Sequence, residues 1–240
     1  VDSWRSAGHQ NSLVGVPHST VRYWDLRYFF DTRTYNASER CNMPRPDYVG
    51  VNGDAAKLSY INCGYPRSEL IEVEALRYIH LNHEVNYLYE RKNRVDVNTI
   101  LVLGDSLKRN TANQMEMLGK AVPFIDTKLL YLVKPHPSCP IREDEYPEIN
   151  FVVTNDPIQM LIDRCSIVYT SSGTSAAVDA YCLGQLVVTV RDQKTLNFSP
   201  LKDRDDVLFV NSSLELVDIL NNIENIKNIK KHRENYFYIN

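Results

Sequence analysis

The chain has 240 residues and sets 27 lysines and arginines against 30 aspartates and glutamates, a balance that argues against a general nucleic-acid surface. Its five cysteines are scattered, without a CxxC pair or the spacing of zinc ligands, which indicates a reducing compartment and no structural zinc. No apolar run approaches the roughly 20 residues of a membrane span, and no signal-like segment opens the sequence, so we expect a cytoplasmic protein.

The first half has the pattern of a short α/β lobe over residues 1–85. The predicted elements are strands over 13–16 and 47–51, a helix over 54–62 that Gly64 ends, and a strand over 70–73. Polar residues follow the first two strands, as Pro17-His18-Ser19-Thr20 and Asn52-Gly53-Asp54. The lobe has too few elements for a complete Rossmann domain, so we expect that part of it is missing from this chain.

The second half alternates apolar strands with helices and predicts a Rossmann-like lobe over residues 95–225. A stretch rich in charge and asparagine, 80–98, separates it from the first half. The predicted strands are 99–103, 129–133, 151–154, 166–170, 186–190 and 207–210, with helices over 107–119, 157–164 and 174–183 and one from about 212. Strands separated by helices favour a parallel sheet. The predicted fold class is therefore α/β, with two Rossmann-like lobes of which the first is incomplete.

The last stretch, 226–240, predicts a C-terminal helix, because isoleucines recur upstream and within it at helical spacing. Its basic residues include Lys227, Lys230 and Lys231. They form either a solvated helix face or a patch for a membrane surface or an acidic partner.

Lys134-Pro135-His136-Pro137 directly follows an apolar strand. The two prolines restrict the backbone on either side of His136, so the imidazole is held where it can donate to a phosphate oxygen, and Lys134 adds charge. The alternative is an ordinary proline-rich loop with a solvent-exposed histidine.

Ser171-Ser172-Gly173-Thr174 follows another strand and precedes a helix. Gly173 allows a ligand close to the backbone, and the N–H groups that open the helix favour an anion. Asp179, further along the helix, is placed to reach a ribose diol. The alternative is that these hydroxyls only cap the helix.

Taken together, the KPHP motif and the SS-G-T-x4-D-A-x3-G motif about 35 residues later resemble the donor-binding lobe of GT-B glycosyltransferases of bacterial capsule and O-antigen synthesis. Kdo transferases and polysialyltransferase-like enzymes are the most similar, and CDP-glycerol transferases share some elements. Residues 15–20 resemble a turn in the N-terminal lobes of these enzymes, with Pro17 and Ser19 in place of Gln and Gly. The resemblance covers about residues 12–222.

The resemblance implies transfer of a sugar from a nucleotide-activated donor, CMP-linked or another, to a surface-polysaccharide acceptor, with no cofactor. The partners it implies are the donor and a glycan or lipid-linked glycan, with peripheral association at the inner membrane. It implies that Lys134 and His136 contact the donor phosphate. Further implied donor contacts are Ser171, Ser172, Gly173 and Thr174, with Asp179 at the ribose and Gly104, Asp105 and Ser106 as a donor loop. His18 is the predicted catalytic residue on the acceptor side, with Asp25, Asp31 and Asp54 as other candidate bases.

Several alternatives stay open. A non-catalytic nucleotide-sugar-binding subunit would keep the anion site alone, and a GT-B-fold 2-epimerase would use the same scaffold, although its usual Ser-Gly-Gly with paired Glu is absent. Gly104-Asp105-Ser106-Leu107 matches the nucleophile block of GDSL hydrolases, but the Asp-x-x-His that would complete that site is missing. Asp203-x-Asp205 imitates the metal pair of GT-A transferases and is read instead as a solvated charge cluster.

Overall fold

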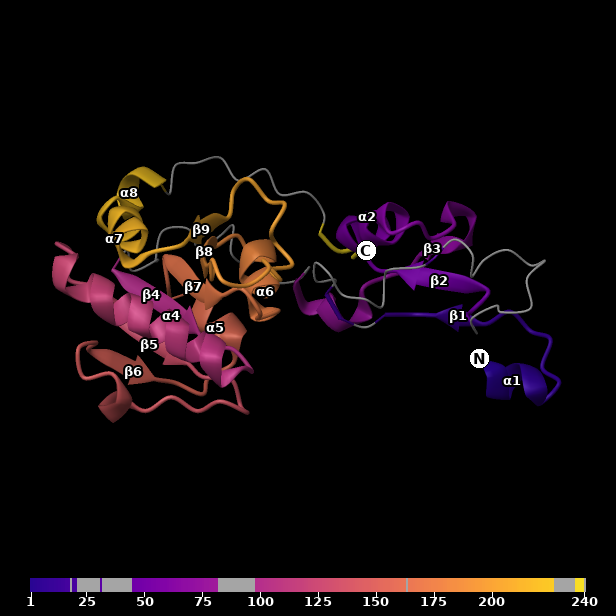
Figure 1. Ribbon diagram of the computed structural model, residues 1–240, viewed down its shortest axis with the longest axis horizontal. Coiled ribbons are helices and arrows are strands. Elements are labelled where there is room, and N and C mark those ends of the chain that lie inside the picture. The colour runs from indigo at the N-terminus through magenta and orange to yellow at the C-terminus, as the bar shows by residue number, and fades with distance from the viewer. Residues whose placement is uncertain are drawn as a thin grey trace. The chain divides into compact units, whose positions relative to one another are not determined.

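The computed structural model describes residues 1–17, 19–20, 31, 45–81, 98–162, 164–226 and 236–239 (Figure 1). The chain divides into two compact units, Val1–Asn82 together with Glu234–Asn240, and His83–Arg233. Each unit contains a parallel β-sheet flanked by helices, which confirms the predicted α/β class. Within the described residues, no helix is both long enough and apolar enough to cross a bilayer.

The first unit has a three-stranded sheet in the order β1-β2-β3. Its elements are α1 (Asp2–Ser6), β1 (Val14–Gly15), β2 (Tyr48–Val51), α2 (Asp54–Asn62), η3 (Arg67–Glu69), β3 (Leu70–Glu72) and η4 (Leu76–Tyr78). Val49 and Val51 of β2 pack with Ala56 and Tyr60 of α2 in a small apolar core. Gly64, with φ of 84°, follows the end of α2, as expected for a glycine that ends a helix. The predicted strands and helix of this half are confirmed, with shorter β1 and β3.

Residues 236–239 pack on this same unit, although they come from the other end of the chain. The Tyr238 N–H donates to the Asn52 carbonyl at 2.9 Å, and the Ala75 N–H donates to the Tyr238 carbonyl at 2.8 Å. The Phe237 ring stacks on Tyr78 with centroids 3.8 Å apart. The returning segment therefore lies at the carboxyl end of β2.

The second unit has six parallel strands in the order β6-β5-β4-β7-β8-β9. Its strands are β4 (Thr99–Leu103), β5 (Leu130–Lys134), β6 (Phe151–Val153), β7 (Ile167–Ser171), β8 (Leu186–Val190) and β9 (Leu208–Val210). Its helices are α4 (Lys108–Ala121), η5 (Val122–Phe124), η6 (Glu143–Glu145), α5 (Ile158–Ile162), α6 (Ala176–Cys182), α7 (Ser213–Asn221) and α8 (Ile223–Ile226). Every residue of the central strands β4, β7 and β8 is buried, which explains their largely apolar sequences.

Helices cover this sheet because alternate strand residues point to opposite faces. Ile100 and Val102 of β4 share one apolar cluster with Met115 and Leu118 of α4 and with Leu216 of α7. The helix α6 packs against β7 and β8 through its own buried alanines and valine. The sheet is thus enclosed by helices, and its loops come together at the strand ends.

The path of the chain through the sheet locates a binding position. From β4 the chain moves outward through β5 to β6, and it then returns to β7 on the other side of β4 and moves outward again to β9. The direction reverses between β4 and β7. Open α/β sheets bind ligands outside the carboxyl ends of the strands at this reversal.

The end of the chain differs from the continuous helix expected over 226–240. Residues 236–239 are not helical, so the expected helix does not continue through them; residues 227–235 lie outside the described residues. Lys227, Lys230 and Lys231 lie outside the described residues, so their role as a solvated or membrane-facing patch stays a prediction.

Candidate functional site

Three loops meet at the carboxyl edge of the six-stranded sheet, after β4, β5 and β7. The Gly104 N–H, after β4, donates to the Lys134 carbonyl at the end of β5 at 3.0 Å. A Cβ atom at Gly104 would lie 3.2 Å from the His136 amide nitrogen and 3.4 Å from the Pro135 Cα. The absence of a side chain at Gly104 therefore lets the first two loops pack backbone to backbone.

Asp105 links the loop after β4 to the loop after β7. One carboxylate oxygen accepts hydrogen bonds from the Ser171 hydroxyl at 2.5 Å and the Asn110 amide at 3.1 Å. The other accepts from the Leu107 N–H at 3.0 Å and the Ser106 hydroxyl at 3.2 Å. Burial alone would raise the pKa of Asp105, but the hydrogen bonds led by that from Ser171 outweigh it and lower the pKa. Asp105, with only 1% of its surface exposed, is thus a buried carboxylate that stays ionised at neutral pH.

The loop after β7 rests on this carboxylate. The buried Ser171 hydroxyl donates to Asp105 and accepts from the Gly173 N–H at 3.4 Å. A Cβ atom at Gly173 would collide with the Asp105 carboxylate. Ser172 is half-buried, and the Thr174 hydroxyl accepts from the Ala176 N–H at 3.4 Å, where α6 begins. The N-cap residue of α6 is Ser175, and no side chain caps the helix, so the Thr174 bond orders the turn just before it.

His136 is held in a defined orientation on the loop after β5. Its Nδ1 accepts from the Ser138 N–H at 3.2 Å and lies 2.7 Å from the Ser138 hydroxyl oxygen. Because Nδ1 accepts a hydrogen bond, we assign the ring proton of the neutral imidazole to Nε2. His136 is half-buried, and the assigned tautomer makes Nε2 a hydrogen-bond donor toward an anion.

Lys134 is directed away from the strand reversal. Its ammonium donates to the Asp156 carbonyl at 2.7 Å and to the Asn155 carbonyl at 3.4 Å, after β6. β6 lies on the opposite side of β5 from β4. The phosphate contact predicted for Lys134 would require its ammonium to leave these carbonyls.

Asp179 lies on the first turn of α6 and is half-buried. Its helix follows the Ser171–Thr174 loop directly, so Asp179 and that loop belong to the same part of the site. Contact with a ribose stays a prediction for this residue.

Polar residues on the buried side of α4 also support the site, and the sequence reasoning did not identify them. The Thr111 hydroxyl accepts from the Asp105 N–H at 3.0 Å and donates to the Asp105 carbonyl at 3.1 Å. The fully buried Gln114 amide donates to the Leu103 carbonyl at 3.2 Å and the Tyr169 carbonyl at 3.0 Å, and so bridges β4 and β7. Asn110, Thr111 and Gln114 share a helix face, and polar residues on an otherwise buried face were the signal that could have revealed them.

Arg109 is a further residue that the sequence reasoning missed. It lies on the first turn of α4, its side chain is 74% exposed, and its guanidinium lies 3.8 Å from the Asp192 carboxylate, which follows β8. Asp192 is held in a turn, since its other oxygen accepts from the Lys194 N–H at 2.8 Å. Arg109 therefore brings a positive charge to the edge of the sheet where the loops meet.

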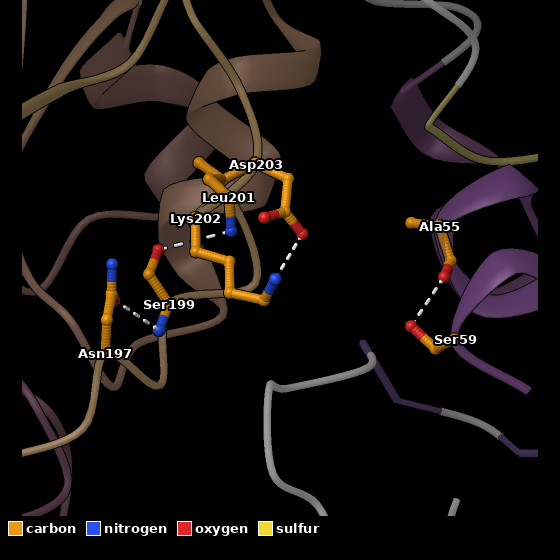
Figure 2. A network of polar contacts seen from close by, with 7 residues as sticks. All are labelled: Ala55, Ser59, Asn197, Ser199, Leu201, Lys202 and Asp203. Carbon is orange, nitrogen blue, oxygen red and sulfur yellow. Dashed lines mark hydrogen bonds and ion pairs between the residues drawn. The ribbon is translucent and has the colours of Figure 1, made fainter. Parts of the chain in front are cut away.

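The loop between β8 and β9 is ordered by side-chain to backbone hydrogen bonds (Figure 2). The Ser199 N–H donates to the Asn197 side chain at 3.0 Å, and the Leu201 N–H donates to the Ser199 hydroxyl at 3.2 Å. Lys202 pairs with Asp203, which agrees with a charge cluster in place of a metal pair.

Figure 2 also contains a contact within α2 of the first unit, where the Ser59 hydroxyl donates to the Ala55 carbonyl at 2.8 Å. No three histidines, cysteines or acidic residues of the described ranges are grouped as metal ligands.

Two of the four candidate catalytic bases, Asp31 and Asp54, lie within the described residues. His18 and Asp25 lie outside the described residues, and Asp31 is exposed. Asp54 accepts a hydrogen bond from the Tyr238 hydroxyl at 2.6 Å. His18 therefore stays a prediction.

The hydrolase alternative finds no support in the geometry around Ser106. A hydrolase serine donates its proton to an imidazole. The Ser106 hydroxyl donates instead to the Asp105 carboxylate, while His136 bonds with Ser138.

Comparison with known proteins finds solved structures of similar fold. No protein family and no curated protein matches the sequence. The UDP-GlcNAc 2-epimerase of Methanocaldococcus jannaschii, solved with UDP-GlcNAc and UDP, is 14% identical with a TM-score of 0.56 over 80% of this chain and 57% of that chain. TarM is 14% identical with a TM-score of 0.54 over 91% of this chain and 45% of its own. Anabaena HepE in complex with UDP is 14% identical with a TM-score of 0.53 over 93% of this chain and 66% of its own.

The chain spans less than two thirds of the length of each of these proteins. At such low identity the likeness is one of fold. This chain has the α/β fold of these GT-B proteins, with parallel sheets flanked by helices.

Proposed function

We propose that this chain binds a nucleotide-activated sugar at the carboxyl edge between β4 and β7 and transfers the sugar to a glycan acceptor without a metal. The observation that carries the proposal is the meeting of three polar loops at the point where the strand order reverses. Ligand binding at this point is general in open α/β sheets. The residues gathered there decide the kind of ligand.

Those residues suit a phosphate. His136 presents Nε2–H as a donor, and Arg109 supplies a positive charge near the same edge. Ser172 and the backbone of its loop add neutral donors. When the glycosidic bond to the nucleotide breaks, negative charge develops on the departing phosphate, and groups fixed in advance around that charge stabilise the transition state. The acceptor hydroxyl must lose its proton to a base, for which His18 is the proposed residue.

The donor is proposed to carry a pyrimidine nucleotide. HepE was solved with UDP and the Methanocaldococcus epimerase with UDP-GlcNAc and UDP. The KPHP and SSGT motifs of this chain resemble enzymes that use CMP- and CDP-linked donors. A glycan or lipid-linked glycan acceptor, a cytoplasmic location and peripheral association with the inner membrane complete the proposal.

An epimerase is the second candidate, because the Methanocaldococcus UDP-GlcNAc 2-epimerase is among the solved structures of similar fold, with a TM-score of 0.56. An epimerase would convert UDP-GlcNAc to its 2-epimer without an acceptor. A transferase would release free nucleotide only when an acceptor is present. A binding subunit would bind the nucleotide but would neither epimerise UDP-GlcNAc nor transfer a sugar.

Calorimetric titration of the protein with CMP, CDP, UDP and GDP tests the proposal. We expect one pyrimidine nucleotide to bind, and we expect His136→Ala and Arg109→Ala each to weaken its binding by about tenfold, as for the loss of a charge-assisted hydrogen bond. Lys120→Ala, which removes an exposed charge from the last turn of α4, is the matched control and should bind like the wild type. The absence of binding by any nucleotide, or variants that bind like the wild type, would contradict the proposal.

A further inference from the structure

We propose that Asp105 is a positioning residue that holds the Ser171–Thr174 loop in its ligand-binding conformation, and that Ser171 belongs to this support and does not contact the ligand. The inference rests on the proposed function, since it concerns the same nucleotide site. It changes the expected roles of two residues that the resemblance had assigned to the donor.

The Asp105 carboxylate has no hydrogen-bonding capacity left for a ligand. A carboxylate offers about four lone-pair positions. Four donors fill them, namely the Ser171 and Ser106 hydroxyls, the Asn110 amide and the Leu107 N–H. The backbone N–H and carbonyl of Asp105 are also occupied, both by Thr111. A residue so saturated and so buried neither binds a ligand nor acts as a general base.

The hydrogen bonds to Asp105 join separate segments of the chain. Leu107 and Asn110 belong to the start of α4, while Ser171 ends β7. The backbone of Gly173 rests directly on the carboxylate, in a space that no side chain fits. Asp105 therefore fixes the conformation of the Ser171–Thr174 loop relative to the start of α4.

The Ser171 hydroxyl makes two hydrogen bonds within the protein. It has one proton, and it donates that proton to Asp105 while it accepts from the Gly173 N–H. Ser171 is 3% exposed. With its proton committed, Ser171 has no donor for a phosphate, and Ser172 is left as the serine of this loop that can contact a ligand.

The direction in which Asp105→Asn changes nucleotide affinity distinguishes a positioning role from a purely electrostatic one. Removing a negative charge near a bound phosphate would strengthen binding if the charge acted only through repulsion. An amide, however, keeps a single acceptor oxygen and presents an NH2 group to two of the four donors. If Asp105 positions the loop, its replacement by Asn weakens binding.

The experiment measures nucleotide affinity and amide hydrogen exchange on the whole protein, for Asp105→Asn, Ser171→Ala and the double variant. We expect Asp105→Asn to weaken binding by about tenfold and Ser171→Ala by about fivefold. The double variant should be no weaker than Asp105→Asn, because the two residues act through one hydrogen bond. Exchange at the amides of Gly173 and Thr174 should accelerate by about tenfold in Asp105→Asn, without acceleration in α7.

Ser166→Ala is the matched control. Ser166 is a buried serine just before β7, at the opposite end of that strand, and its hydroxyl donates to the Thr99 carbonyl at 3.3 Å. Its removal should lower the melting temperature and leave both nucleotide affinity and loop exchange unchanged. A merely structural role for Asp105 would give the same result as this control.

Equal or tighter binding by Asp105→Asn, or strictly additive losses in the double variant, would overturn the inference. If Asp105→Asn does not fold, hydrogen exchange in Ser171→Ala carries the test: faster exchange at the Thr174 amide supports the positioning role, and weaker binding without faster exchange overturns it. If the wild type binds no nucleotide, the proposed function fails, and hydrogen exchange still decides whether Asp105 holds the loop.

Discussion

Two strand ends in this molecule carry similar residues and differ in what covers them. Gly104-Asp105-Ser106 follows β4, and Asn52-Gly53-Asp54 follows β2. After β4, the acidic side chain is bonded by residues of neighbouring loops and a helix, and other polar groups remain at the edge of the sheet. After β2, the returning segment 236–239 supplies the bonds, including that from the Tyr238 hydroxyl to Asp54.

In both places a glycine allows the close approach. Gly173 packs on Asp105, and a Cβ atom at Gly53 would collide with the Tyr236 carbonyl and lie 3.0 Å from the Phe237 Cα. Polar residues at the end of a buried strand require hydrogen-bond partners. Either a ligand or another segment of the chain can supply them. Substitutions at the end of β4 and at the end of β2 distinguish a ligand from a chain segment as the partner.

The largest effect should come from removing the anchor of the returning segment. Phe237 is 6% exposed and stacks on Tyr78, so Phe237→Ala should destabilise the first unit by about 3 kcal/mol. Denaturant unfolding measures the loss. Leu76→Ala, at a neighbouring side chain that is 72% exposed, should change stability little. Equal effects of the two would show that the segment does not stabilise the end of β2.

A smaller effect is expected where a side chain is added at the β7 loop. The methyl group of Gly173→Ala would collide with the Asp105 carboxylate, at a cost of about 2 kcal/mol in stability. Thermal unfolding measures this cost, and Gly173→Ala should also bind nucleotide more weakly. A variant as stable as the wild type would mean that the loop does not rest on Asp105.

A loss of about 1 kcal/mol is expected for Tyr238→Phe, which removes the hydroxyl that donates to Asp54. This contact also predicts a pH dependence. Burial first, and then the Asp54 carboxylate, raise the pKa of Tyr238 above its ordinary value of 10.0. The stability that this contact contributes is therefore complete below pH 10 and is lost as the pH rises above it toward the raised pKa. Unfolding measured from pH 8 to 11 should reveal a steeper loss in the wild type than in Tyr238→Phe, and parallel curves would contradict the assignment.

The smallest effect is expected on the surface of the first unit. Lys57 of α2 pairs with Glu72 of β3 at 2.5 Å, and the Glu72 side chain is 56% exposed. Exposed ion pairs contribute little because water and salt screen them, so Lys57→Ala should cost about 0.5 kcal/mol or less. A cost comparable to that of Tyr238→Phe would mean that surface charge contributes as much as the returning segment.

Much of the fold could be predicted from the sequence, because the buried strands are continuous apolar runs. The strands over 99–103 and 186–190 have the predicted bounds, and the others in the second half agree to within one residue at each end. Several of these runs end next to a glycine, a proline or a charged residue, as at Gly104, Pro135 and Arg191, so local composition marked their ends. The boundaries of α6 were less predictable, since Thr174 and Ser175 precede the helix that they were expected to join.

The site was predicted less completely, because the direction of a side chain depends on its neighbours in space. The sequence placed two polar loops at one edge of a parallel sheet, and the structure agrees. Nothing in the KPHP motif indicates that Lys134 bonds to the carbonyls after β6. Nothing in the SSGT motif distinguishes Ser171, bonded to a carboxylate 66 positions away, from Ser172.

The position of residues 236–239 was the least predictable feature. The bond between Tyr238 and Asp54 joins residues 184 positions apart, and periodicity in a sequence window carries no information over that distance. Because the segment completes the core beside β2, it also sets an order for biosynthesis. The second unit is continuous in sequence and can acquire its structure as it leaves the ribosome, whereas the unit made first must wait for a segment translated long after it. During that interval the ring of Tyr78 and the end of β2 lack their covering, and a nascent chain stalled before residue 236 would expose them to chaperones.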